Sequence, residues 1–307
     1  MRTSDIMSTV ARALSVLLRL PTRELYLGWR FMQNDIWAGV IPGVAFTAVA
    51  LRHAPVDLGS SIQILLRSVC YFCLYLYGHT LANQIAGIEE DRVNKPERPL
   101  PAGMVSPNGA TVRLVVVTAL FVLLGWRLGV LRWAALWATT YLLLNFYGHL
   151  HWFFKNCLPM SVGATAMLCA AWEMAAPLTP SVWHAVLTIA GFVALTSPIQ
   201  DFRDIAGDRV MGRKTLPIAL GERPARILVS IGLIGWLPMA YVLHMRTALD
   251  TLPGGVVAIA ITALECVVTA RLLCPPEVGR TAADHQTYRF YEYLYCLYVG
   301  SAFVFVS

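Results

Sequence analysis

The sequence predicts an all-α, polytopic membrane protein with nine transmembrane helices. Hydrophobic residues make up 57% of the 307 positions and charged residues only 14%, and the mean hydropathy is +0.59. Soluble globular domains have a different profile, with roughly a quarter of their residues charged. The apolar residues also fall in long runs, and a helix needs about 20 mostly apolar residues to cross a bilayer.

The N-terminal segment, residues 1–30, contains several arginines and has no small-residue cleavage site before Pro21. This pattern indicates a cytosolic amphipathic helix at the membrane surface rather than a cleaved signal peptide. No soluble domain interrupts the apolar runs that follow, so residues 1–307 are expected to form one membrane domain. We predict spans at 31–51, 60–86, 109–129, 131–149, 158–177, 182–200, 225–245, 252–273 and 287–306.

The basic residues predict how these spans are oriented. If the N-terminus is cytosolic, the loops after the even-numbered spans lie on the same side as residues 1–30. The 24 Lys and Arg residues then all lie in these cytosolic segments or at the adjoining span ends, except for Arg52, Arg67, Arg127, Arg132 and Arg246. The positive-inside rule therefore favours a cytosolic N-terminus, in either a bacterial cytoplasmic membrane or the endoplasmic reticulum.

Two charged segments follow the second and sixth spans, and we expect cytosolic cap loops over 83–108 and 200–224. The first combines acids and bases at Glu89, Glu90, Asp91, Arg92, Lys95, Glu97 and Arg98. The second does the same with Asp201, Arg203, Asp204, Asp208, Arg209, Arg213 and Lys214. Carboxylates with Lys and Arg beside them suit a diphosphate bridged by a divalent metal, because the acids bind the metal and the bases neutralise phosphate oxygens.

The spacing of the acids supports a shared site. On a continuous helix, Asn83, Gly87, Glu90 and Asp91 fall at i, i+4, i+7 and i+8 and share one face. The acids of 201–208 fall at i, i+3 and i+7 and also share one face. Both segments end even-numbered spans, so they can face each other at one mouth. The alternative is that each is an ordinary charged loop between spans.

These motifs resemble those of the UbiA superfamily of intramembrane prenyltransferases, and the resemblance covers nearly the whole chain. That family pairs Asn-Asp-x-x-Asp-x-x-x-Asp after the second helix with Asp-x-x-Asp-x-x-x-Asp after the sixth. Here Asn83 and Asp91 match the first motif, and the acids of 201–208 match the second. The resemblance implies a helical barrel around a central cavity, a cytosolic cap over Mg²⁺ sites that hold two or more ions, and a prenyl diphosphate substrate.

The first motif departs from the common family pattern. Gln84 and Gly87 stand where prenyltransferases have aspartates, and Glu90 is a candidate replacement carboxylate beside Asp91. This form looks like the branch that contains membrane-bound terpene cyclases. We therefore expect a Mg²⁺-dependent cyclase that acts on farnesyl or geranylgeranyl diphosphate. The alternatives are prenyl transfer to an aromatic or lipid acceptor, and a transporter or prenyl-lipid binding protein that performs no chemistry.

The predicted site has two groups of residues. The predicted metal ligands and catalytic residues are Asn83, Glu90, Asp91, Asp201, Asp204 and Asp208. The predicted diphosphate-binding residues are Lys95, Arg98, Lys155, Arg203 and Lys214. Besides the prenyl diphosphate and the lipid bilayer, the sequence indicates no partner: neither a nucleic acid nor an obligate protein partner is expected.

A cyclisation would also need aromatic faces for carbocations and a group that accepts a proton. Glu173 and Glu265 lie within predicted spans, and either is a proton acceptor or a neutral, hydrogen-bonded packing residue. Asp35 is expected to be an interface or cap group. The aromatic candidates in or beside the spans are Trp133, Trp137, Tyr141, Phe146, Tyr147, Trp152, Trp172, Phe192, Tyr288, Tyr291 and Tyr295.

Overall fold

The computed structural model describes residues 21–148, 151–276 and 278–306, and within these ranges it contains helices and no strand. Most of the predicted amphipathic segment, residues 1–20, lies outside the described residues, and residues 21–32 are helical. The long helices are α2 (Val40–Leu51), α3 (Leu58–Ala86), α5 (Pro107–Arg127), α6 (Leu131–Leu143), α7 (Leu158–Glu173), α8 (Pro180–Thr196), α11 (Glu222–Ala240), α12 (Leu252–Leu273) and α13 (Arg280–Gly300).

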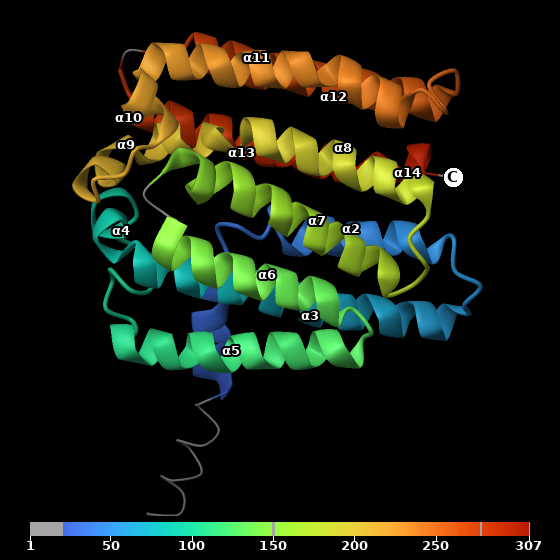
Figure 1. The fold of residues 1–307 in the computed structure, drawn as a ribbon, viewed down its shortest axis with the longest axis horizontal. Coiled ribbons are helices and arrows are strands. Elements are labelled where there is room, and N and C mark those ends of the chain that lie inside the picture. The colour runs from blue at the N-terminus through green and yellow to red at the C-terminus, as the bar shows by residue number, and fades with distance from the viewer. Residues whose placement is uncertain (1–20, 149–150, 277, 307) are drawn as a thin grey trace, which may run out of the picture.

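Shorter helical segments connect or extend these helices. They are α4 (Ile88–Asn94), α9 (Asp201–Val210), α10 (Leu216–Leu220), α14 (Ala302–Phe305), the π-helical turns Leu144–Gly148, Phe153–Cys157 and Tyr241–Met245, and the 3₁₀ turn Ser197–Gln200. The long helices lie side by side in Figure 1, and α4, α9 and α10 gather at one end.

Local sequence signals set where several long helices begin. Ser106, Thr179 and Thr251 accept a hydrogen bond from the backbone N–H three residues later, and a proline follows each of them within the first turn of α5, α8 and α12. Asp57 caps α3 in the same way, through Ser60 N–H at 3.1 Å. These side chains satisfy backbone donors that have no partner inside the helix, and proline at the first turn loses no hydrogen bond.

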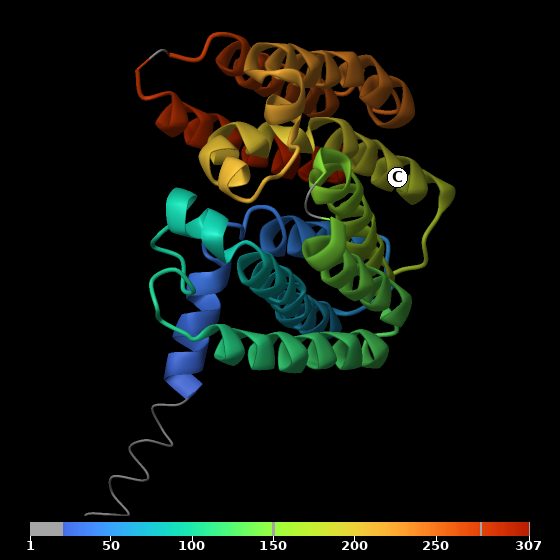
Figure 2. The same ribbon diagram turned by 60° about the vertical axis from the view of Figure 1, so that its left-hand side comes forward.

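The helices of the N-terminal half and those of the C-terminal half form two groups that pack against each other. α3 packs against α2, α5 and α6, while α8 packs against α7, α11 and α13, and the contact of α13 with α2 joins the second half to the first. In Figure 2 the end that carries α4 and α9 is turned toward the viewer. α4 packs directly against α9, so the two charged segments meet at one end of the bundle.

The protein is an integral membrane protein, but the number of spans stays a prediction. Five helices within the described ranges are long and apolar enough to cross a bilayer: Leu58–Ala86, Pro107–Arg127, Pro180–Val210, Glu222–Met245 and Leu252–Leu273. The other predicted spans also coincide with helical segments, but α2, α6 and α7 have only 12, 13 and 16 residues. The helix of the ninth span, α13, includes several charged residues.

One local prediction is wrong. α3 ends at Ala86, and Gly87 separates it from α4, so Asn83, Glu90 and Asp91 do not lie on one continuous helix. Gly87 is the last residue before the chain turns, and its lack of a side chain makes it a weak helix former. By contrast, the three acids of 201–208 lie on the single helix α9 and are all buried, as the spacing predicted.

Candidate active site

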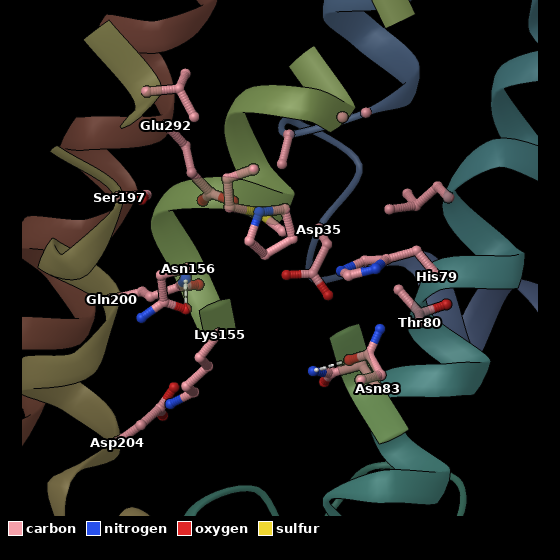
Figure 3. Close-up of a pocket in the computed structure, with 18 of the residues that line it drawn as sticks. Asp35, His79, Thr80, Asn83, Lys155, Asn156, Ser197, Gln200, Asp204 and Glu292 are labelled. Carbon is pink, nitrogen blue, oxygen red and sulfur yellow. Dashed lines mark hydrogen bonds between the residues drawn. The ribbon is translucent and has the colours of Figure 1, made fainter. Parts of the chain in front are cut away.

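A cavity lies at the end of the bundle where α4 meets α9, and polar groups from both sequence halves line it. Figure 3 shows Asn83 on one wall, with Lys155 and Asp204 on the facing wall. The cavity occupies about 1420 Å³, including the open water at its mouth. Its wall includes these predicted site residues: Asn83, Glu90, Lys95, Arg98, Lys155, Arg203 and Asp204.

The acids of α9 are bound by basic residues from other segments. Lys155 Nζ lies 2.7 Å from Asp208 Oδ1 and 3.2 Å from Asp201 Oδ1. Lys95 Nζ lies 2.8 Å from Asp204 Oδ1. All three carboxylates are buried, and the cations that hold them reach in from the loop after α4 and from the π-helical turn before α7. Such ion pairs are costly to break on one side only, because the remaining charge would stay buried.

The acids of α4 are bound in the same way. Arg98 Nη1 donates to both carboxylate oxygens of Asp91, at 2.9 and 3.1 Å. Arg213 forms an ion pair with Glu90 and also donates to Asp208 Oδ1 at 3.0 Å. Because Arg213 follows α9 while Glu90 belongs to α4, this guanidinium joins the two predicted motifs. Asp91, Asp201 and Asp208 lie behind the cavity wall, in contact with cations that line it.

Hydrogen bonds of a single asparagine also hold α4 against α9. Asn94 Nδ2 donates to the carbonyl of Asp204 at 3.0 Å, and Gly207 N–H donates to Asn94 Oδ1 at 3.1 Å. A Cβ atom on Gly207 would lie 2.4 Å from Asn94 Nδ2 and 2.6 Å from Glu90 Cγ. The two helices therefore approach so closely that only glycine fits at position 207 without a shift.

Glu90 occupies the space beside Gly87. A Cβ atom built on Gly87 would lie 3.3 Å from Glu90 Oε2 and 3.4 Å from Arg213 Nη2. The carboxylate of Glu90 thus lies next to the point where a side chain at position 87 would begin. Its role as a replacement carboxylate stays a prediction.

Arg213 and Lys214 have opposite environments although they are neighbours. The Arg213 side chain is 3% exposed and lines the cavity, whereas Lys214 is exposed and is not part of the cavity wall. Of the predicted diphosphate-binding residues, Lys214 is the one that the fold does not bring to the cavity. The sequence places Arg213 in the second charged segment. Spacing alone cannot show which of two adjacent residues faces the cavity.

Burial and charge act against each other on the groups at the mouth. Burial alone would raise the pKa of Glu90, but the charges of Lys155, Lys95 and Arg213 outweigh it and the pKa is lowered. Burial raises the pKa of Asp91 despite the neighbouring Arg98. Burial also lowers the pKa of Lys95, more than Asp204 raises it. Each shift reflects a charge removed from water next to a compensating charge.

Away from the charged mouth, aromatic and aliphatic side chains line the cavity. Tyr75 and Trp137 stack with ring centroids 4.8 Å apart, and Tyr291 and Tyr295 of α13 line the same space. Arg203 lies over the ring of Tyr288, 3.7 Å from its centroid, at the boundary between the two zones. Trp137, Tyr288, Tyr291 and Tyr295 are thus the predicted aromatic residues that reach the cavity.

Several polar residues of the wall were not selected from the sequence. They are Asp35, His79, Thr80, Gln84, Asn156, Ser197, Gln200, Arg213 and Glu292. Asn156 donates to Asp201 Oδ1 at 2.7 Å and accepts a hydrogen bond from Gln200, which orients the acid from behind. Asp35 lies in the wall, with Arg98 Nη2 3.7 Å from its carboxylate, and is therefore not a simple interface group. Some of these residues are single polar positions inside apolar runs. That pattern was the signal by which the sequence could have identified them as site residues.

The donors at the mouth suit a hard divalent cation. They are carboxylate and amide oxygens, the ligands that Mg²⁺ prefers. Asp201 Oδ2 and Gln84 Oε1 are buried and have no hydrogen-bond partner among the described residues. Within those residues no three acidic, histidine or cysteine groups converge on one point, because each carboxylate is turned toward a Lys or Arg.

Comparison with known proteins places this arrangement in a family. Residues 27–285 match the model of the UbiA prenyltransferase family, and the chain belongs to that family. It is 43% identical over 211 residues to somaliensene A/B synthase of Streptomyces somaliensis, which covers 68% of this chain and 70% of that protein. It is 34% identical over 279 residues to the diterpene cyclase eriG of Hericium erinaceus, covering 90% of this chain and 87% of that one.

Relatives with a different reaction are also similar. The polyprenyl transferase eriF of Hericium erinaceus is 33% identical over 279 residues, covering 89% of this chain and 92% of that one.

Among solved structures, the fold is similar to that of a UbiA homolog from Archaeoglobus fulgidus bound to DMAPP and Mg²⁺, with a TM-score of 0.61 and 13% identity over 90% of this chain and 98% of that one. The protein is therefore an enzyme of the UbiA type, related to both terpene cyclases and prenyltransferases.

Proposed function

We propose that this protein is a Mg²⁺-dependent terpene cyclase that ionises and cyclises farnesyl or geranylgeranyl diphosphate and releases diphosphate. The observation that carries the proposal is the pairing of α4 with α9 across the mouth of a cavity whose deeper wall is aromatic. The charged mouth suits the diphosphate and the aromatic zone suits the prenyl chain. Relatives named as a terpene synthase and a diterpene cyclase support the reaction type.

The charged mouth would hold the leaving group. Lys95, Lys155 and Arg213 now bind carboxylates, and a diphosphate entering the cavity would bring them competing anionic oxygens. Arg98 and Arg203 also line the cavity wall. When these cations neutralise the charge that develops on the diphosphate, the allylic C–O bond breaks more easily.

The carboxylates freed in this exchange would hold Mg²⁺. The proposed ligands are Asn83 at the end of α3, Glu90 and Asp91 on α4, and Asp201, Asp204 and Asp208 on α9. When bound, the metal withdraws electron density from the diphosphate and so helps it leave. The UbiA homolog from Archaeoglobus fulgidus solved with DMAPP and Mg²⁺ supports a metal of this kind, and the number of ions is part of the proposal.

After ionisation the cavity has to protect a carbocation from water. Tyr75, Trp137, Tyr291 and Tyr295 present aromatic rings in the cavity wall, and the negative face of an aromatic ring stabilises a nearby cation. The whole chain would act as one membrane domain. Its N-terminus and this mouth would face the cytosol, where charged diphosphates are soluble.

Prenyl transfer to an acceptor is the second candidate. It is favoured by the polar groups that line the cavity wall, including Asp35 and His79, and by the polyprenyl transferase relative. An acceptor hydroxyl would need such groups for its orientation and for loss of its proton.

The test uses membranes that contain the protein, Mg²⁺, and farnesyl or geranylgeranyl diphosphate without any acceptor. Extracts are analysed by gas chromatography and mass spectrometry, with a chelator control. We expect a chelator-sensitive cyclic hydrocarbon or alcohol from one of the two substrates. Product that forms only after a phenolic or lipid acceptor is added would refute cyclisation and support prenyl transfer. Equal product in the chelator control would refute the metal assignment.

A further inference from the structure

We propose that Glu292 is the proton acceptor that completes the reaction in this cavity. The inference rests on the proposed function, because a cyclisation that ends in an alkene must release one proton from the prenyl skeleton. Glu292 lies on α13 and lines the cavity. In Figure 3 it lies on the wall opposite His79, with Asp35 between them.

The environment of Glu292 is unusual for a carboxyl group. The residue is 2% exposed, and neither carboxyl oxygen has a hydrogen-bond partner within the described residues. Burying a carboxyl group that makes no hydrogen bond is costly, and natural proteins keep few of them. Such a group in a substrate cavity indicates that its partner is a group of the substrate.

One basic residue of the same helix pairs with Glu292. Arg289 Nη1, one turn earlier on α13, lies 2.8 Å from Glu292 Oε2, in an ion pair that lacks hydrogen-bond geometry. Burial favours the neutral form of a carboxyl group, and a neighbouring cation opposes that effect. In its ionised form Glu292 can receive a proton from the cavity.

The other acids of the wall are paired with basic residues of the charged mouth. Asp204 is held by Lys95, and Asp35 lies beside Arg98. His79 Nδ1 is buried without a hydrogen-bond partner among the described residues, and the ring packs against Trp137, with centroids 5.1 Å apart. Glu292, in contrast, lies on the α13 face that also presents Tyr288, Tyr291 and Tyr295 to the cavity. These rings would surround a hydrocarbon cation next to the carboxylate.

The two acids that the sequence offered for this role lie elsewhere. Glu173 accepts hydrogen bonds from Arg132 and, at 2.6 Å, from Trp133 Nε1, and it borders a different, shallow depression. Glu265 of α12 is buried without a hydrogen-bond partner in the described part of the chain, but it does not line the cavity. Neither is positioned to reach a prenyl chain whose diphosphate is held at the mouth.

The step is balanced as follows. The diphosphate leaves with the electron pair of the allylic C–O bond, and alkene electrons of the same chain close the ring and move the positive charge. A C–H bond next to the final cationic carbon then breaks, and its electron pair forms the new C=C bond. The proton passes to a carboxylate oxygen of Glu292, which returns it to water or to the departing diphosphate before the next turnover.

The test compares Glu292→Gln, Glu292→Asp and the control Glu265→Gln in the full-length protein with the substrate that the wild type uses. Diphosphate release and terpene product are measured in parallel. Glu265 is an apt control because it matches Glu292 in burial and in its lack of a hydrogen-bond partner, but not in its access to the cavity. A general base contributes roughly 10²–10⁴-fold to a reaction rate. We therefore expect Glu292→Gln to lower the rate of formation of the normal terpene product by about 100-fold.

The ratio of the two readouts separates the possible results. We expect Glu292→Gln to release diphosphate within about 10-fold of the wild-type rate and to form prematurely quenched alcohols instead of the normal product. Glu292→Asp should retain part of the normal product, and Glu265→Gln should retain the wild-type ratio. An unchanged product profile in Glu292→Gln would overturn the assignment, as would an equal fall in both readouts. If the wild type releases no diphosphate from either substrate, the proposed function fails first.

Discussion

Substitution of Gly207 by alanine tests whether close packing of α4 on α9 builds the active site. In an ordinary helix this change is favourable, because glycine is about 0.8–1.0 kcal/mol worse than alanine. Here the new methyl group would lie 2.4 Å from Asn94 Nδ2 and 2.6 Å from Glu90 Cγ. Ordinary contact begins near 3.4 Å, so the side chains of Asn94 and Glu90, or the helix that carries them, have to move by about 1 Å.

The sign of the effect on stability follows from two opposing contributions. Overpacking of this kind costs about 1–3 kcal/mol and exceeds the gain in helix propensity, so we expect a net destabilisation of about 1 kcal/mol. In a chain of this size that lowers the melting temperature by about 2 °C. Activity should fall further, because a 1 Å displacement of reacting groups can cost about 100-fold in rate.

The assay combines thermal unfolding in detergent with Mg²⁺-dependent diphosphate release. Gly235→Ala is the matched control, since Gly235 lies in α11 and an added Cβ would meet no atom within 4 Å. We expect it to leave turnover near the wild type and to raise stability by up to about 1 kcal/mol. Because Asn94 makes the closest contact, the double variant with Asn94→Ala should lose less stability than the sum of the single variants. A Gly207→Ala protein with normal turnover would refute the reasoning.

Three further substitutions or treatments test the mouth. Arg213→Ala, which leaves Glu90 and Asp208 without their shared guanidinium, should lower turnover by about 100-fold or more, whereas Lys214→Ala should stay within about 3-fold. The opposite order in a steady-state assay would return the role to Lys214. Asp204→Asn should abolish turnover while the protein still elutes as a folded species in detergent, and full activity would exclude it as a ligand. Chelation should stop diphosphate release and added Mg²⁺ should restore it, and a chelator-resistant rate would contradict metal dependence.

Helical periodicity was informative where the helix is continuous and failed where it is interrupted. The acids of 201–208 could be assigned to one face because α9 runs through all of them. The first motif could not, because the break at Gly87 turns the chain between Asn83 and Glu90. One missing side chain decides this break, and the surrounding residues give no periodic signal for it.

The sequence could not predict which of two neighbouring basic residues faces the cavity, because that also depends on a local turn. Arg213 and Lys214 follow Gly212, whose positive φ of 64° reverses the chain after α9. Which of the two side chains then points inward depends on that turn and not on composition. Glu292 was missed because it stands in an aromatic stretch that a hydropathy reading treats as packing. Its spacing from Tyr288 and Tyr295, four residues before and three after, places the three on one face, which was the available signal.

The ion pairs at the mouth predict that the proposed metal and diphosphate would bind together. A metal alone would have to displace Lys155 from Asp208 and Lys95 from Asp204, and would leave these ammonium groups buried without partners. A diphosphate alone would attract the same cations and leave the carboxylates unpaired. If both entered, the carboxylates would turn to the metal, the cations would turn to phosphate oxygens, and no buried charge would be left uncompensated. The internal salt bridges would thus disfavour binding of either ligand by itself, and they would keep the mouth compact until the complete substrate arrives.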